Sequence, residues 1–342
     1  MLSRDEAKKI VDRFVDIRIL VVGDLMLDRY VFGAVNRISP EAPVPVVHVT
    51  RESSRPGGAS NVSLNIASMG GSSTIAGIIG RDEAGQALLN TFDTTGIETD
   101  GIVRDGEIRT TVKTRIIAER QQVARVDYEE NGDMHEDRIR ELCDAIPALV
   151  RDSDGVILED YGKGVICQEV VDAVLKAAKE NGKSVGFDPK DNHHLELEWL
   201  TLATPNYREA CLATGQPQVP LGDAPEHCPE LQAAGTTLAE RWGTEFLLIT
   251  LGSHGMYLCP RGASPSVQPT LAQEVFDVSG AGDTVIAVAM LALAAGAEHA
   301  QAAAMANHAA GVVVGKVGTA TCSPAELLAS LGEAAPSQEQ AS

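Results

Sequence analysis

The sequence predicts an α/β domain built around a mostly parallel β-sheet. Short runs of β-branched and other apolar residues alternate along the chain with amphipathic or alanine-rich stretches of helical character. The chain has 342 residues, of which 44% are hydrophobic, so one large domain or two small ones can bury a substantial core. The glycines follow no short period, which argues against repeat and collagen-like classes.

Five apolar runs are expected to be strands of this sheet, and each ends in a polar residue or a glycine. They span residues 18–24, 155–160, 184–188, 202–206 and 246–252. Ligands bind at the carboxyl ends of parallel strands, so the polar residues that end four of these runs should surround one crevice. These residues are Asp24, Asp160, Asp188 and Asn206. Each could instead cap the helix that follows, and for Asp160 and Asp188 that alternative has equal weight.

Two segments interrupt the alternation of strand and helix. Residues 44–50 and 110–128 carry the period-two pattern of strands, with no helix between successive runs. This pattern predicts a small antiparallel sheet over the crevice, and a lid suits these lengths better than a second domain. We place the lid segments at about 29–50 and 108–128.

Two other stretches of the chain lack a periodic pattern. The proline-rich residues 215–230 are expected to form a surface loop. Residues 334–342 are expected to form a flexible tail after the folded domain.

Charge and cysteine content exclude several classes of function. The 48 acidic and 28 basic residues give a net charge of -20, which argues against a nucleic acid or an anionic membrane surface as a partner. The six cysteines lack metal-binding spacing and are expected to be free thiols in a reducing cytoplasm. Neither a signal peptide nor a membrane span is expected, so we place the protein in the cytoplasm. Because the net charge is negative, any phosphate that the protein binds must be held by a local arrangement of groups.

The most specific motif is DVSGAGDT at residues 277–284, which is followed at once by an apolar helical run. Gly280, Ala281 and Gly282 place small residues at a helix N-terminus, where free N–H groups and the helix dipole favour an anion. Asp283 would stand beside this anion site as a general base. A carboxylate that merely caps the helix fits the spacing equally well.

A pair of glycines precedes another predicted helix. Gly57 and Gly58 would let the backbone approach a ligand closely, and Asn61 and Asn65 share one face of the helix. Taken alone, these residues also fit an ordinary helix start with Asn61 in the cap region.

Two further motifs follow strands in the second half of the chain. Thr250, Gly252 and Gly255 could contact phosphates through the backbone or form a glycine-rich hairpin turn. Asn206 and Glu209 offer oxygen atoms that suit Mg²⁺ with its water shell, although such residues are more often structural. The P-loop motif and the dinucleotide-binding G-x-G-x-x-G motif after the first strand are both absent.

In order and spacing, these four motifs resemble the ribokinase-like (PfkB) carbohydrate kinases. This resemblance implies a ribokinase-like three-layer domain over about residues 16–330, with the small β lid. Within the family, residues 22–30, 37–45 and 160–164 are similar to bacterial heptose-7-phosphate kinases. The implied reaction is ATP-dependent phosphorylation of the anomeric hydroxyl of D-glycero-D-manno-heptose 7-phosphate to the 1,7-bisphosphate. That product serves ADP-heptose and lipopolysaccharide core biosynthesis.

The resemblance also implies roles for individual residues. Asp283 would deprotonate the anomeric hydroxyl, and the motif from Gly280 to Gly282 would hold the transferring phosphoryl group. The residues expected to bind the sugar phosphate are Asp24, Asp28, Arg37, Gly57, Gly58, Asn61, Lys113, Arg120, Asp160 and Lys163. The residues expected to bind ATP are Lys190, Asn206, Glu209, Thr250, Gly252, Gly255 and Asn307. Asn206 and Glu209 would also manage Mg²⁺, and a monovalent cation is left open as a further cofactor.

The distal phosphate of the sugar needs a second cationic site. Arg55, Arg115 and Arg125 are further candidates for it, although about half of all these basic residues are expected to be solvated surface charges. Two residues depart from the family pattern: Ser279 replaces the frequent Thr, and Glu159 stands where a small polar residue is usual.

The expected partners are small molecules and a second copy of the chain. A phosphosugar and ATP would bind, and a homodimer would satisfy the exposed edges of the lid strands. No nucleotidyltransferase domain is expected after the kinase, unlike in the fused bifunctional enzymes, so a separate adenylyltransferase would be needed.

Two other functions are also consistent with the sequence. One is a ribokinase-like kinase of a neutral sugar such as fructose or ribose, which the run at residues 37–45 disfavours. The other is a non-catalytic sugar- or nucleotide-binding relative, which the intact Asp283 and its preceding glycines disfavour.

Overall fold

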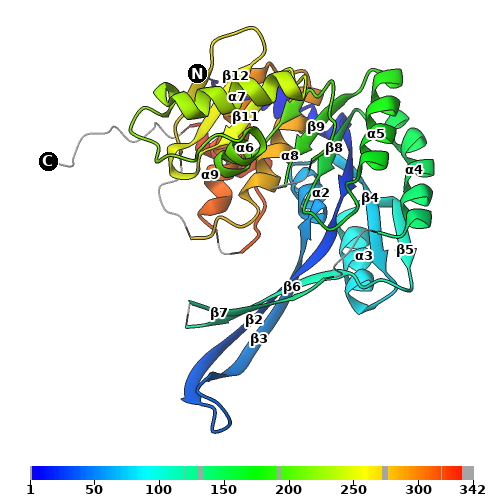
Figure 1. Ribbon diagram of the computed structural model, residues 1–342, viewed down its shortest axis with the longest axis vertical. Helices are drawn as coiled ribbons and strands as arrows, with labels where there is room; N and C mark the ends of the chain where they lie inside the picture. Colours follow the sequence, from blue (N-terminus) through cyan, green and yellow to red (C-terminus); the bar gives the residue numbers. More distant parts are fainter. Residues whose placement is uncertain are drawn as a thin grey trace, which may run out of the picture.

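The fold consists of one β-sheet covered by helices on both faces and a second sheet that projects from this body (Figure 1). The computed structural model describes residues 2–119, 121–129, 134–190, 194–271, 276–316 and 318–332. In edge-to-edge order, the larger sheet contains β13 (Ser266–Gln268), β12 (Met256–Pro260), β11 (Phe246–Thr250), β10 (Leu202–Ala203), β9 (Ser184–Asp188), β8 (Gly155–Glu159), β1 (Arg18–Gly23), β4 (Ser72–Gly80) and β5 (Glu98–Asp105).

Most of the larger sheet is parallel, as the sequence predicts. All pairings from β11 to β5 are parallel, whereas β12 and β13 continue the sheet in antiparallel fashion beyond β11. The five predicted strands are the five adjacent strands at the centre, namely β1, β8, β9, β10 and β11. Their carboxyl ends therefore lie along one edge of the sheet.

Ten α-helices in the described residues cover the two faces of this sheet. One face packs against α1 (Arg4–Val11), α2 (Ala59–Ser68), α3 (Glu83–Thr95), α8 (Ala281–Ala294), α9 (His299–Val314) and α10 (Pro324–Ser330). The other packs against α4 (Glu136–Arg151), α5 (Gln168–Asn181), α6 (Tyr207–Thr214) and α7 (Pro229–Arg241). Short 3₁₀ helices occupy η1 (Phe14–Asp16), η2 (Pro225–His227) and η3 (Gly252–His254).

Alternate residues of the central strands supply the two cores. On β1, Ile19 and Val21 pack on the α8 side, whereas Leu20 and Val22 pack on the α5 side. All four side chains are 0% exposed, and burial of each contributes about 1.5–3 kcal/mol. Helix α8 is apolar on nearly all sides because α2 and α9 cover it as well as the sheet. This packing fixes the N-terminus of α8 at the carboxyl edge of the sheet.

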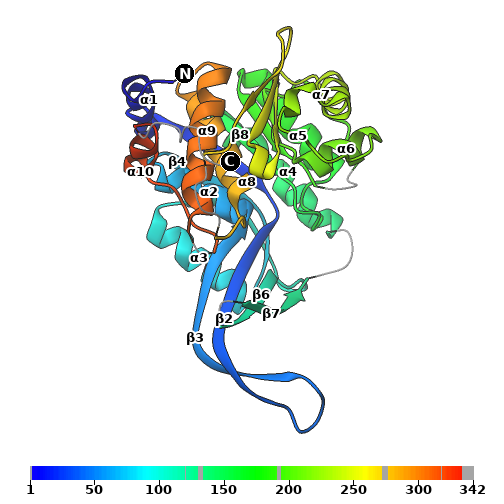
Figure 2. The same cartoon turned by 90° about the vertical axis from the view of Figure 1, so that its left-hand side faces the viewer.

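The smaller sheet corresponds to the predicted lid and keeps that name below. It contains β3 (Pro45–Gly58), β2 (Leu25–Ile38), β6 (Thr111–Ala118) and β7 (Gln121–Tyr128) in that order. Its outer pairs are antiparallel, and its central pair β2–β6 is parallel. Strands β2 and β3 have 14 residues each, so the ribbon is about 46 Å long (Figure 2). The strands begin nearer the body than the predicted lid segments, because Leu25 already pairs with Gly58.

The proline-rich loop, the cysteines and the C-terminal tail were also predicted from the sequence. Residues 216–224 form the predicted loop, which ends in η2 and the start of α7. The six cysteines are free. Among the described residues, no helix combines the length and apolar character required to cross a bilayer. The predicted tail at 334–342 and the candidate Arg120 lie outside the described residues.

Candidate active site

A cavity of about 660 Å³ opens at the carboxyl edge of the larger sheet. Residues from several predicted motifs line it together: Asp160, Asp188, Lys190, Asn206, Glu209, Thr250, Gly252, Gly255, Gly280, Ala281, Gly282, Asp283 and Asn307. These residues are far apart in the sequence and meet because the parallel strands and α8 end at the same edge. The volume suits a ligand of nucleotide size.

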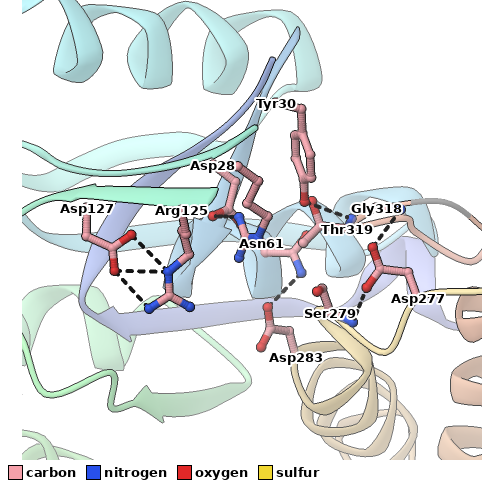
Figure 3. Close-up of polar contacts among 11 residues, drawn as sticks. Asp28, Tyr30, Asn61, Arg125, Asp127, Asp277, Ser279, Asp283, Gly318 and Thr319 are labelled. Carbon is pink, nitrogen blue, oxygen red and sulfur yellow. Dashed lines mark hydrogen bonds and ion pairs between the residues drawn. The ribbon is translucent and has the colours of Figure 1, made fainter. Parts of the chain in front are cut away.

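Asp283 lies in the first turn of α8 and is 3% exposed. The Asn61 side chain donates a hydrogen bond to its Oδ2 atom at 2.6 Å (Figure 3), and the Tyr161 hydroxyl donates to its Oδ1 atom at 2.7 Å. The N-cap of α8 is Gly280, which offers no side-chain cap. The Asp283 carboxylate is therefore held by side chains from two other elements, and the capping alternative does not describe its main contacts.

Burial raises the pKa of Asp283, and the negative charge of Asp28 acts in the same direction. The hydrogen bonds from Asn61 and Tyr161 lower the pKa and partly offset the effect of burial. A buried carboxylate with a raised pKa and fixed orientation has the properties of a general base.

Gly280 has a positive φ of 79° directly before this helix. A Cβ atom at this position would lie 2.7 Å from the Asn61 Nδ2 atom, so a side chain would disturb the contact between Asn61 and Asp283. The glycine motif thus serves both the turn and the position of the carboxylate.

Three carboxyl groups meet beside the cavity, and two of them, Asp188 and Asp283, line it. Ligand atoms of Glu159, Asp188 and Asp283 all lie within 4.8 Å of one another. Glu159 is 0% exposed, and neither carboxyl oxygen accepts a bond from an N–H or O–H donor among the described residues. Burial and the neighbouring carboxylates raise the pKa of Glu159 and of Asp188 well above their usual values. This set of oxygen ligands suits a divalent cation such as Mg²⁺. In the sequence, Glu159 stands out only as a departure from the family pattern.

Asn206 and Glu209 cap helix α6 and also line the cavity. The Asn206 Oδ1 atom accepts from the Glu209 N–H at 2.9 Å, and the Glu209 Oε2 atom accepts from the Asn206 N–H at 2.8 Å. This reciprocal pair is a capping box that begins α6. Both residues line the cavity, next to the Asp188 side of the acidic cluster.

The segment from Thr250 to Gly255 is a glycine-rich hairpin turn and also lines the cavity, so both sequence-based interpretations describe it. It joins the antiparallel strands β11 and β12, and its Gly252 and Gly255 have positive φ angles. The turn also lines the cavity, as does Asn307, whose Nδ2 atom donates to the Pro269 carbonyl at 2.8 Å. A Cβ atom at Gly255 would lie 2.0 Å from the Gln268 carbonyl oxygen, so this position requires glycine.

Cationic side chains gather where the lid joins the body. Arg115 on β6 forms an ion pair with Asp28 on β2 at 2.5 Å, and Lys163 forms one with Glu129 at 2.6 Å. Lys113 on β6 lies over the Tyr161 ring, with its Nζ atom 5.2 Å from the ring centroid. Burial lowers the pKa of Lys113, and the nearby lysines add to this effect.

The structure places Asp24 differently from the sequence-based expectation. Asp24 is 1% exposed and is not part of the cavity lining. Its carboxylate oxygens accept hydrogen bonds from the backbone N–H groups of Tyr161, Lys163 and Val165 at 2.8 to 3.0 Å. Asp24 therefore holds the segment after β8 in place and does not face the cavity.

The glycine pair at the lid root serves close backbone packing. A Cβ atom at Gly57 would lie 2.7 Å from the Asp28 Oδ2 atom, and one at Gly58 would lie 2.6 Å from the Asp24 carbonyl oxygen. Both residues are buried, and Gly58 has a positive φ where β3 turns into α2.

Arg37 lies far along the lid, whereas Arg55 pairs in register with Asp28, and Arg125 with Arg115, but both of these arginines have other side-chain partners. Arg37 is exposed near the far end of β2, nine residues beyond Asp28, which corresponds to about 30 Å of extended strand. Arg55 donates to the Thr319 carbonyl at 2.6 Å, and Arg125 pairs with Asp127 on the exposed strand β7 (Figure 3). The ribbon carries Arg37 away from the cavity lining, and the contact of this residue with the sugar stays a prediction.

The segment before α8 is joined to a loop from the C-terminal part of the chain. Asp277 accepts from the Ser279 N–H at 2.9 Å and from the Gly318 N–H at 3.1 Å (Figure 3). The Thr319 N–H in turn donates to the Tyr30 hydroxyl of the lid at 3.4 Å. The lid, this loop and the N-terminus of α8 thus form one connected structure.

The chain is similar to known carbohydrate kinases. The model of the pfkB family of carbohydrate kinases matches residues 16–326. "Bifunctional protein HldE" of Pelobacter propionicus is 43% identical over 327 residues, which cover 96% of this chain and 66% of that protein. The same-named protein of Citrifermentans bemidjiense is 42% identical over 334 residues, covering 98% and 67%. The chain therefore spans about two thirds of the length of the curated relatives it matches.

Solved structures of two sugar kinases share the fold. Arabidopsis thaliana ribokinase, in complex with ribose and ATP, has a TM-score of 0.71 at 21% identity and covers 93% of this chain and 99% of its own. Escherichia coli phosphofructokinase-2, in complex with potassium, has a TM-score of 0.72 at 19% identity, covering 93% and 100%. The predicted ribokinase-like α/β architecture is confirmed.

Proposed function

The chain belongs to the pfkB family of carbohydrate kinases, and from this premise we propose that it transfers the γ-phosphoryl group of ATP to the anomeric hydroxyl of heptose 7-phosphate. The observation that carries the proposal is the position of Asp283. Its carboxylate stands at the N-terminus of α8, between the cavity on one side and the cationic lid root on the other. This is where an acceptor hydroxyl and a transferring phosphoryl group would meet.

The reaction needs a proton acceptor and a site for the phosphoryl group. Asp283 takes the proton of the acceptor hydroxyl as the bond between the sugar oxygen and the γ-phosphorus forms. The bond between this phosphorus and the bridging oxygen of ADP breaks, and ADP leaves. Gly280, Ala281 and Gly282 present the N-terminal end of α8 to the phosphoryl oxygens, where the backbone dipoles stabilise their negative charge.

ATP occupies the cavity with its phosphates directed toward α8 in this proposal. Thr250, Gly252, Gly255 and Asn307 line its nucleotide side, and Lys190 lines the phosphate side. Asn206 and Glu209 would hold Mg²⁺ through its water shell, beside the Asp188 carboxylate. The bound Mg²⁺ would neutralise charge on the phosphates during transfer.

Lys113 supports a substrate that already bears a phosphate. Its ammonium group is half-buried at the lid root, close to the Tyr161 ring and on the acceptor side of Asp283. The heptose identity rests on the resemblance at residues 22–30, 37–45 and 160–164. A cytoplasmic setting belongs to the same proposal, because ATP and free thiols are both typical of that compartment.

A neutral-sugar kinase is the second candidate, and one observation favours it. Arg115 and Lys163 are already paired with Asp28 and Glu129, so these two cations need no substrate phosphate to balance their charge. A neutral acceptor would leave both ion pairs intact.

A substrate panel tests the proposed function. We expect ADP release with D-glycero-D-manno-heptose 7-phosphate, and phosphorus NMR of the product should show a new anomeric phosphate. Unphosphorylated heptose, fructose and ribose should react poorly. Efficient turnover of fructose or ribose would favour the neutral-sugar kinase, and absence of ADP release with every sugar would favour a binding protein.

We also propose that the protein is a homodimer joined through its lids. Among the described residues, the lid edges β3 and β7 are unpaired on their outer sides, and Val49, Val123 and Val126 expose 39–45% of their surface there. Sedimentation velocity at micromolar concentration should therefore report a dimer. Val123→Glu should shift the mass to that of a monomer, whereas Val15→Glu, at a more exposed position outside the lid, should not. A monomeric wild-type protein would contradict the proposal.

A further inference from the structure

Asn65 is a buried polar residue of α2 that has no role in the proposed function so far. It is 0% exposed, it follows Asn61 by about one helical turn, and it is not among the residues that line the cavity. Helix α2 packs against α8, which carries Asp283 in its first turn. A buried amide is costly unless it is hydrogen-bonded, so the partners of Asn65 indicate what its side chain does.

Both ends of the Asn65 amide are hydrogen-bonded. Its Nδ2 atom donates to the backbone carbonyl of Asn61 at 2.9 Å, and its Oδ1 atom accepts from the Thr284 hydroxyl of α8 at 2.9 Å. A carbonyl oxygen can only accept, so the first contact determines which end of the amide faces Asn61. Thr284 is 0% exposed and directly follows Asp283 in the chain. Asn65 therefore joins the two helices next to Asp283.

The contact between Asn61 and Asp283 closes these bonds into a ring. The Asn61 Nδ2 atom donates to the Asp283 Oδ2 atom at 2.6 Å (Figure 3), and the ring returns to Asp283 through Asn65 and Thr284. The Asn61 Oδ1 atom is buried and has no hydrogen-bond partner among the described residues. Within that part of the chain, the bond to Asp283 alone orients the Asn61 amide. The contact consequently depends on how α2 and α8 lie relative to each other.

We infer that Asn65 is a positioning residue for the base, which sets Asn61 against Asp283 by joining α2 to α8 through Thr284. The inference rests on the proposed function in that Asp283 is the base. Displacement of a reacting group by about 1 Å can lower a rate about 10²-fold. Apolar contacts between the two helices persist without Asn65, so the displacement should be smaller than this. We therefore expect a loss of about tenfold in kcat.

Asn65→Leu tests the inference, because leucine has nearly the same size and can form neither bond. The Thr284 hydroxyl keeps the Gly280 carbonyl as an acceptor at 3.1 Å, so its proton is not left unpaired. The rate constant kcat should fall about tenfold, and KM for ATP should change little. Ile66→Val on the same helix is the control, since it removes buried packing and lowers stability but touches none of these bonds. Equal kcat values in Asn65→Leu and Ile66→Val would overturn the inference.

Thr284 provides a second pair of variants. Thr284→Val removes the hydroxyl and should lower kcat about tenfold, whereas Thr284→Ser keeps the hydroxyl and should retain the wild-type kcat. Asn65→Leu combined with Thr284→Val should be about as slow as either single variant, because both changes break the same bond. Independent effects would instead multiply to about 100-fold. Such multiplication, or a Thr284→Ser variant as slow as Thr284→Val, would contradict the inference.

A further measurement does not depend on turnover. In protein labelled with nitrogen-15 asparagine, the side-chain amide signals of Asn61 can be assigned by their loss in Asn61→Ala. Exchange of these amide protons with solvent should be faster in Asn65→Leu than in the wild type, and unchanged in Ile66→Val. Unchanged exchange in Asn65→Leu would overturn the inference. Failure to phosphorylate heptose 7-phosphate, with faster exchange in Asn65→Leu, would overturn only the proposed function.

Discussion

Asp283→Asn should abolish turnover while leaving the affinity for ATP nearly unchanged. The amide keeps the shape of the carboxyl group but cannot accept the proton of the acceptor hydroxyl, and loss of a general base typically lowers kcat by about 10²–10⁴-fold. The glycine turn that precedes Asp283 and the N-terminus of α8 remain in the variant, so the binding site for the phosphates persists. Steady-state kinetics would measure the loss, and titration calorimetry the affinity for ATP.

Asp172→Asn is a matched control for this experiment. Asp172 lies on the exposed side of α5, where it accepts a hydrogen bond from Gln168, and it is not among the residues that line the cavity. Its replacement should leave kcat within about twofold of wild type, as for most surface changes. Retention of more than about a tenth of the wild-type rate in Asp283→Asn, well above the loss expected for a base, would remove Asp283 from that role.

Lys113→Met should abolish most of the preference for a phosphorylated sugar. A charge-assisted contact between the Lys113 ammonium group and the distal phosphate should favour the phosphosugar by about 10–100-fold in kcat/KM. In the variant, KM for the phosphosugar should rise by a similar factor, because the lost contact is made in the ground state and the transition state alike. KM for ATP should change little. Methionine keeps the apolar stem that packs at the lid root.

Lys176→Met on the exposed surface of α5 provides the control for loss of one lysine. The wild-type preference should also weaken at high pH, because burial lowers the pKa of Lys113 and the ammonium group is neutral above that pKa. Equal kcat/KM values for heptose 7-phosphate and for unphosphorylated heptose or fructose would contradict the phosphosugar assignment and favour the neutral-sugar kinase.

The centre of the fold could be predicted from the sequence because its strands are buried on both faces. Such strands are continuous apolar runs, as in Ile19 to Val22, and they are distinct from the helices between them. Strand β4 was missed because serine, threonine and glycine interrupt its apolar character, and β5 because four of its eight residues are charged. The predicted lid segment is shorter than the hairpin of β2 and β3. The residues near the body, several of them polar, pair within the sheet as the other residues of these strands do.

The candidate site was predictable as a set of motifs but not as a set of contacts. Strand ends and glycine turns placed Asp283, Asn206 and Thr250 near one another, since parallel strands end at one edge. The partners of Asp283 required the folded chain, because Tyr161 is 122 residues away in the sequence and Asn61 is 222. The position of Asp24 at a strand end likewise could not reveal that backbone N–H groups surround its carboxylate.

The lid hairpin of β2 and β3 begins and ends at neighbouring points of the body. Leu25 pairs with Gly58, and the Ala59 N–H donates to the Asp24 carbonyl at 3.1 Å. The whole hairpin is therefore an insertion whose two junctions already touch, and its length can change without displacing β1 or α2. In the proposed function its proximal residues, such as Asp28, would face the acceptor, and the nucleotide would bind elsewhere. We therefore expect that this hairpin can be exchanged as a unit between related chains. Such an exchange would alter the specificity for the acceptor while the ATP-binding part stays the same.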